Sequence, residues 1–413
     1  MDKMILKNGI KVDIKTNKNT PRTAIVMHIR YNKNNTGKKS IYSLLSSLLF
    51  QGTKSRSAEQ LAQELDENAI DIYYDLKADY MRFKILCLNE DVNLALNIFQ
   101  DMFENSTLDN YKKEIQKIKG DLISELDSAK AQAKDEYLKT VYKNHQYAFS
   151  RKDAIEELET VTKEDLFEVF EQLKYIMAKN IFVVSDKTKE EILPLIEKHF
   201  EKLGVKETEY DTNLIEEIKE NRVSTIIKDD ANQAQIYMGW AIPIISFEEW
   251  PIINLVNTIL GSAGLSSRLF LELREKKGLA YTVRSSYAIN RLGSDFYVYI
   301  ATEPKNIKTS IEGFQVEINK IMTEPMSSEE LENAKNNAIG KRQFLFETNM
   351  SEAIIRGLYK YWGVDYDYEQ KFIESVKEIT KEDIMNFSKK YFSAPTALCV
   401  LAPEKYLKES GLI

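Results

Sequence analysis

One pattern occurs twice in this chain, as AIEELETVTKEDLFEVF at residues 154–170 and as FIESVKEITKEDIMNFS at residues 372–388. In each copy a Thr followed by Lys, Glu and Asp is typical of a helix N-cap with acidic residues in the first turn. An amphipathic helix should follow. A strand should come next, in IFVVSD at 181–186 and in ALCVLAP at 397–403, because both runs are rich in β-branched or small apolar residues.

A second correspondence lies upstream of each copy. Residues 111–145 and residues 331–362 are both long, free of proline and helical in pattern. In both pairs the two matching segments are separated by nearly the same number of residues, which indicates a duplicated unit. We therefore expect two homologous domains at 1–203 and 224–413, joined by a polar, acidic linker at 204–223.

Each half has the predicted order strand, helix, strand, long helices, helix, strand. Alternating apolar and polar residues place the clearest strands at 70–88, 234–242 and 294–302. This order is typical of an α+β fold in which helices pack on an antiparallel-rich sheet.

Composition excludes several functional classes. The chain has 413 residues, with 43% hydrophobic and 29% charged, which is usual for a globular protein. Its net charge is −7 and no basic run is present, so nucleic acid is not an expected partner. Two cysteines cannot form a disulfide framework and are expected to be buried. No apolar run is long enough for a signal peptide or a membrane span, which favours the cytoplasm.

Residues 261–287, GSAGLSSRLFLELREKKGLAYTVRSSY, contain the most specific candidate site. The early glycines lack the G-K-[ST] of a phosphate loop. Arg274 and Tyr281 lie seven positions apart with a helix-breaking KKG between them, so both can converge on one spot. Together they would offer donors to a peptide carbonyl or a developing oxyanion. An ordinary structural Arg and Tyr is the alternative.

Residues 265–283 resemble the C-terminal half of the insulinase/pitrilysin-type (M16) zinc peptidases, and the resemblance spans nearly the whole chain. It is to the small two-domain subfamily that includes the mitochondrial processing peptidase subunits. The resemblance implies that two subunits close into a clam-like chamber. It also implies that Arg274 and Tyr281 match a pair that holds substrate opposite a metal, including the metal of a partner subunit.

The N-terminal half departs from this family at the metal site. Family peptidases carry H-x-x-E-H on a helix followed by F-x-G-T, whereas this chain has Ser43, Ser46 and Ser47 at the three motif positions and then Phe50, Gly52 and Thr53. Serine hydroxyls are weak zinc ligands and none replaces the general base. The family's third ligand is a downstream glutamate, and Glu125 lies in that neighbourhood. No metal site is therefore expected in this chain.

Substrate binding by strand addition is the other property that the resemblance implies. The matching strand is NAIDIYYDLKADY at residues 68–80, where Ile70, Ile72 and Tyr73 replace the family's usual continuation. Backbone pairing at an open sheet edge would bind a peptide with little sequence preference. An internal strand without such a role is the alternative.

These observations predict a metal-less subunit that is not a peptidase alone. It would form a heterodimer with an H-x-x-E-H-bearing M16 subunit, which would hold zinc, and act on short or unfolded peptides. A non-peptidase scaffold of the same fold is the main alternative. An independent enzyme that uses unrecognised residues is a third alternative. Ser43 or Ser46 as a nucleophile lacks a nearby His or Lys in a matching motif, which favours small residues that pack a helix. A homodimer would be inert.

Overall fold

The computed structural model describes residues 2–31, 36–206 and 208–413, and the chain forms two compact units. Unit 1 comprises residues 1–121, 154–211 and 343–368, and unit 2 comprises residues 122–153, 212–342 and 369–413. Among the described residues, no helix is both long and apolar enough to cross a membrane.

Unit 1 is built on a mostly antiparallel sheet in the order β1-β2-β6-β3-β5-β4. Among the described strands of this sheet, only β2 and β6 run parallel. The strands are β1 (Asp2–Ile5), β2 (Lys11–Thr16), β3 (Arg22–Arg30), β4 (Asp71–Leu76), β5 (Tyr80–Leu88) and β6 (Lys179–Ser185). The predicted strand at 70–88 is thus a hairpin, with β4 at the edge of the sheet.

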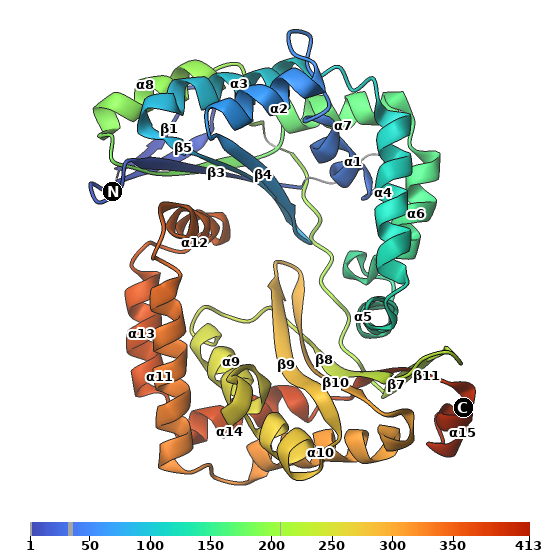
Figure 1. Ribbon diagram of the computed structural model, residues 1–413. Helices are drawn as coiled ribbons and strands as arrows, with labels where there is room; N and C mark the ends of the chain where they lie inside the picture. Colours follow the sequence, from blue (N-terminus) through green and yellow to red (C-terminus); the bar gives the residue numbers. More distant parts are fainter. Residues whose placement is uncertain (1, 32–35, 207) are drawn as a thin grey trace. The chain divides into compact units, whose positions relative to one another are not determined.

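Helices cover both faces of this sheet. Within unit 1, α12 lies on the face opposite α2, α3 and α8 (Figure 1), and it packs on β3 and β6. Alternation of side chains explains why β3 is buried almost throughout: Ala24 and Val26 meet α12, and the intervening residues face the other helix layer. The helices are α1 (Ile41–Leu48), α2 (Ala58–Glu67), α3 (Val92–Asn105), α4 (Tyr111–Leu126), α6 (Arg151–Thr160), α7 (Lys163–Tyr175), α8 (Lys189–Phe200) and α12 (Asn349–Trp362).

Unit 2 repeats the arrangement with a sheet in the order β7-β11-β8-β10-β9. Strands β7 and β11 run parallel, and the other described pairs of this sheet are antiparallel. The strands are β7 (Arg222–Ile227), β8 (Ala234–Ile242), β9 (Ala280–Asn290), β10 (Gly293–Thr302) and β11 (Ala397–Ala402). The α+β, antiparallel-rich fold predicted for both halves is confirmed.

The helices of unit 2 also form two layers. Helix α5 covers one face with a tyrosine-rich core, and α10 and α14 cover the other. The helices are α5 (Ala129–Tyr142), α9 (Trp250–Asn257), α10 (Ile307–Thr323), α11 (Ser328–Phe344), α13 (Tyr368–Glu378), α14 (Lys381–Phe392) and α15 (Glu404–Glu409). A π-helical segment follows α9 at Thr258–Ser262.

The repeat is visible down to single hydrogen bonds. The Thr162 hydroxyl accepts from the Asp165 N–H at 3.1 Å, while the Asp165 carboxylate accepts from the Thr162 N–H at 2.9 Å. Thr380 and Asp383 form the same reciprocal cap at 3.2 and 2.8 Å. Both copies of the repeated sequence therefore begin a helix in the same way.

The two compact units are not separated by a single boundary at 204–223. Helix α5 precedes that segment in sequence but belongs to unit 2, and α12 follows it but belongs to unit 1. These two helices occupy equivalent places in the repeat, so the duplicated halves have exchanged one helix each. Residues 204–206 and 208–221 form no helix or strand.

Candidate functional site

The segment that carries Arg274 is firmly anchored within unit 2. Arg268 donates from Nε and Nη2 to the two carboxylate oxygens of Glu330, at 2.6 and 2.8 Å. Leu273 is fully buried against Gly313, where an added Cβ would lie 2.3 Å from the leucine Cδ2. The wide π-helical turns from Phe270 to Lys276 are therefore fixed on their inner side.

A glycine then turns the chain back toward Arg274. Gly278 has a φ of +61°, and its N–H donates to the Arg274 carbonyl at 3.0 Å, which ends the helix. Strand β9 begins two residues later. Arg274 Nη1 donates to the carbonyl of Tyr281 at 2.6 Å, and its guanidinium carbon lies 4.9 Å from the Tyr281 ring centroid. The structure thus brings Arg274 and Tyr281 together.

Most donors of this pair have no partner in the part of the chain that the structure describes. Arg274 makes only the one hydrogen bond, and the Tyr281 hydroxyl makes none within the described ranges. The Tyr281 side chain is 79% exposed. A guanidinium fork and a phenol that face solvent can donate to one oxygen of a bound peptide.

The pair lies on a pocket of about 570 Å³. Its walls are the π-helical segment after α9, the loop around Gly264, and residues 281–286 of β9. Gly261 allows this close packing, since an added Cβ there would lie 2.1 Å from the Ser285 nitrogen. Ser285 also donates through its hydroxyl to Asn257 Oδ1 at 2.8 Å, which fixes the floor of the pocket.

The serines of the predicted degenerate metal site lie on α1 in unit 1. Ser46 is fully buried, and its hydroxyl has no hydrogen-bond partner within the described residues. Ser47 donates to Glu114 Oε1 at 2.5 Å, and Ser43 is half-buried. This donor set contains no imidazole, and its one carboxylate is already bonded to Ser47 and to Lys117.

Glu114 was missed by the sequence analysis, which considered Glu125. Both residues lie on α4, but Glu114 is buried and reaches α1, whereas Glu125 is exposed and forms an ion pair with Arg151 at 2.6 Å. The helical pattern of 111–145 gave no signal for which acidic residue faces inward. Glu125 therefore does not lie beside the serines.

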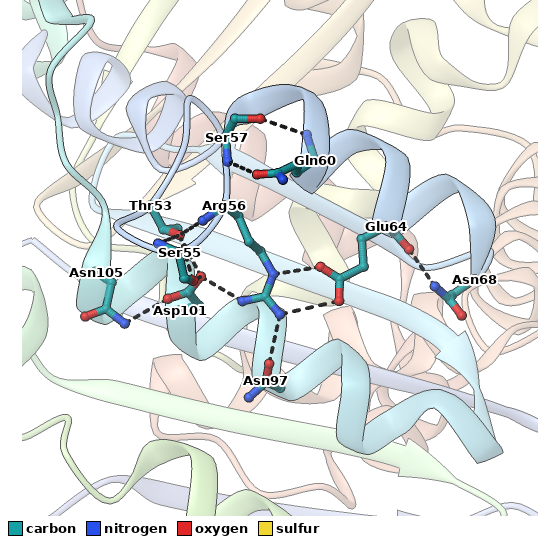
Figure 2. A network of polar contacts seen from close by, with 10 residues as sticks. All are labelled: Thr53, Ser55, Arg56, Ser57, Gln60, Glu64, Asn68, Asn97, Asp101 and Asn105. Atoms are coloured by element: carbon teal, nitrogen blue, oxygen red, sulfur yellow. Dashed lines mark hydrogen bonds and ion pairs between the residues drawn. The ribbon is translucent and has the colours of Figure 1, made fainter.

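The stretch after α1 has a structural role. Gly52 has a φ of +120°, and Thr53 then donates to the buried carboxylate of Asp101 at 2.6 Å. Ser55 and Arg56 donate to the same carboxylate, each at 2.7 Å (Figure 2). Although burial opposes the charge, these hydrogen bonds lower the pKa of Asp101. Gly52 and Thr53 thus fix the turn that links α1 to α2.

The histidines and cysteines lie in other surroundings. In the described part of the chain, no three His, Cys, Asp or Glu side chains form a group that could hold a metal ion. His199 lies between Gln100 and Asn93, and His145 bonds to a backbone carbonyl. Cys87 and Cys399 are buried, and burial raises the pKa of each thiol to about 12.

Strand β4, which was predicted as a possible substrate-binding strand, lies at a sheet edge. Ile70 and Ile72 point into the core, at 4% and 6% exposure, while Tyr73 is exposed and donates to Asp71 at 2.9 Å. Only Tyr73 among the three offers a side chain to a ligand, so Ile70 and Ile72 would contribute backbone groups alone.

Comparison with known proteins identifies the family. Residues 31–155 match insulinase (peptidase family M16), and residues 160–338 match the peptidase M16 inactive domain. An uncharacterized zinc protease of Rickettsia felis is 26% identical over 384 residues, or 89% of each chain. The non-peptidase homolog YmxG of Helicobacter pylori is 20% identical over 84% of this chain and 80% of that protein. The crystal structure of a peptidase M16 inactive domain from Pseudomonas fluorescens has a TM-score of 0.90 at 17% identity, covering 97% of this chain and 98% of that one. The chain belongs to the M16 peptidase family, in its small two-domain form.

Proposed function

We propose that this chain is a catalytically incomplete subunit of an M16 zinc peptidase. It would complete a chamber with a partner that carries H-x-x-E-H, and supply Arg274 and Tyr281 to a peptide held at the partner's zinc site. The observation that carries the proposal is that Arg274 and Tyr281 meet on a pocket, with most of their donors unpaired within the residues that the structure describes.

The residues at the family's metal positions do not fit zinc. A hydroxyl must deprotonate to bind the ion well, and Ser46 is sealed in the core while the Ser47 proton is held by Glu114. A carboxylate that could serve as general base is missing from the motif helix. A relative named a non-peptidase homolog supports the same conclusion.

The free donors suit the oxygen of a scissile peptide. Charge develops on this oxygen in the transition state, and donors that are already in place stabilise it without reorganisation. Removing one such donor typically lowers the rate about 10²–10³-fold. Because Arg274 and Tyr281 face solvent rather than a dry cleft, we expect a smaller effect of about 10- to 100-fold.

The test is peptide hydrolysis by the purified chain, alone and mixed with a co-encoded relative that carries H-x-x-E-H. We expect no hydrolysis by the chain alone and zinc-dependent hydrolysis by the mixture. Arg274→Ala and Tyr281→Phe should lower kcat/KM without changing assembly, which sedimentation velocity would measure. Arg22→Ala and Tyr175→Phe, both at exposed positions of unit 1, are the matched controls.

Three outcomes would contradict the proposal. A mixture that assembles but stays inactive would indicate the scaffold alternative. Full turnover by both Arg274→Ala and Tyr281→Phe would show that the pair does not contact the reacting peptide. Hydrolysis by the lone chain would show that it is an independent enzyme.

A further inference from the structure

The pocket beside Arg274 runs along the free edge of a strand. All six residues from Tyr281 to Ser286 line it, although side chains in a strand point alternately to opposite faces. One cavity can touch six consecutive residues only if it follows the backbone at the side of the strand. Strand β9 is the last in its sheet, and no other described strand pairs with its outer edge.

The pocket is also cationic. Arg274 and Arg284 line it, and none of its lining residues is Asp or Glu. Neither arginine forms an ion pair within the described residues. By contrast, six other arginines bind carboxylates: Arg56, Arg82, Arg151, Arg268, Arg342 and Arg356. The two pocket arginines thus retain uncompensated charge in a chain with an excess of acidic residues.

A third cation stands close to Arg284. Lys130 of α5 lies 5.2 Å from the ring centroid of Tyr299, and Arg284 lies 5.6 Å from the same centroid. Burial and the charge of Arg284 lower the pKa of Lys130. Like charges this close repel each other, and a bound anion would relieve the repulsion.

Apolar side chains flank the same pocket. Leu265 is 73% exposed at its rim, and the ring of Tyr281 faces solvent on the strand. A small inorganic anion would leave these surfaces uncovered. A peptide that has apolar side chains beside an acidic one would cover them and neutralise the arginines.

We propose that this pocket binds an extended peptide segment that pairs with the free edge of β9 and places an Asp or Glu side chain beside Arg284. This inference rests on the proposed function, because it assigns a substrate class to the same site. Backbone pairing would supply affinity for any extended chain, and Arg284 would select for acidic residues.

Direct binding to the lone chain tests the proposal. Fluorescence anisotropy would compare a labelled flexible peptide that has one central Glu with its Gln counterpart, at low and high salt. We expect the Glu peptide to bind about tenfold more tightly at low salt, which corresponds to about 1.4 kcal/mol. Arg284→Gln should abolish this preference, and Arg22→Gln, at an exposed arginine of unit 1, should retain it.

Strand pairing is tested separately by N-methylation of alternate peptide amides. One set of alternate amides faces β9, so methylation of that set should weaken binding of both the Glu and the Gln peptide. Equal affinities for the two peptides, or a Glu preference that survives Arg284→Gln, would overturn the charge selection. Insensitivity to N-methylation, with displacement by inorganic phosphate, would indicate a simple anion site and overturn the peptide assignment.

Failure of this inference and failure of the proposed function are distinguishable. Binding without charge preference, together with turnover that still depends on Arg274, would refute only the acidic selection. Binding that prefers Glu, together with a partner whose turnover ignores Arg274, would refute only the catalytic role.

Discussion

Acid should destabilise unit 1 through a single buried histidine. His28 is fully buried in β3, and neither ring nitrogen has a hydrogen-bond partner within the described residues. Its ring packs against those of Tyr80 and Tyr361, at centroid distances of 5.4 and 6.3 Å, and the two tyrosine rings lie 4.7 Å from each other. Gly357 of α12 lies directly against it, since an added Cβ would be 2.8 Å from the His28 Cε1. An imidazolium at this position would therefore have no hydrogen-bond acceptor among the described residues.

The size of the effect follows from the pKa. Burial, with a smaller contribution from the charge of Arg82, lowers the pKa of His28 from 6.5 to about 3, and Asp75 opposes the change. Because the folded-state pKa is the lower one, protonation favours the unfolded chain. Stability is therefore complete above pH 6.5 and declines as the pH falls toward 3, by about 1.4 kcal/mol per pH unit. At pH 4.5 the loss from this residue should be about 2 to 3 kcal/mol.

Urea unfolding of the wild type and of His28→Leu at pH 7 and pH 4.5 measures this contribution. Leucine has a similar volume and cannot take up a proton. We expect the variant to lose about 2 to 3 kcal/mol less than the wild type between the two pH values. Each protein serves as its own reference at pH 7, where packing alone differs. An equal acid loss in both proteins would refute the assignment to His28.

Three further outcomes are expected. Ser47→Ala should lower the free energy of unfolding by about 1 to 3 kcal/mol in urea, because it removes a hydrogen bond to the buried carboxylate of Glu114; an unchanged midpoint would show that the bond contributes nothing. Gly239→Ala should cost about 3 kcal/mol or more, since its Cβ would lie 2.2 Å from the Tyr137 hydroxyl and 2.5 Å from a backbone oxygen. The control Gly340→Ala, in open space on α11, should instead stabilise the folded chain by up to about 1 kcal/mol. Thermal melts of both glycine variants would measure these changes. The dialysed chain alone should retain no stoichiometric zinc by atomic absorption, and one equivalent would contradict the assignment of the serine site.

The fold was predictable wherever the signal is local. The repeated Thr-Lys-Glu-Asp predicted two capped helices, and the reciprocal bonds of Thr162 and Thr380 confirm both. The exchange of α5 and α12 was not predictable in this way. The sequence pattern of a helix does not say which sheet the helix covers, and only tertiary contacts show it.

The candidate site was likewise predictable only where its residues are close in sequence. Arg274 and Tyr281 are separated by one turn around Gly278, so their spacing alone indicated that they meet. Lys130 and Arg284 come from distant parts of the sequence, and no spacing relates them. Glu114 was hidden for a different reason: a charged residue that becomes buried has no signature in a helical pattern. The net charge of −7 likewise gave no indication of a cationic pocket.

The two candidate sites differ in what their side chains contribute to folding. Ser47 and Thr53 bind buried carboxylates, so unit 1 depends on them whether or not a metal is ever present. The Tyr281 ring is largely exposed and Arg274 has no carboxylate partner in the described chain, so neither contributes much to stability. Replacing Arg274 or Tyr281 should therefore leave the free energy of unfolding within about 0.5 kcal/mol of the wild type. A change in turnover or binding would then report on the site itself, whereas a large loss of stability would indicate that the pair is structural.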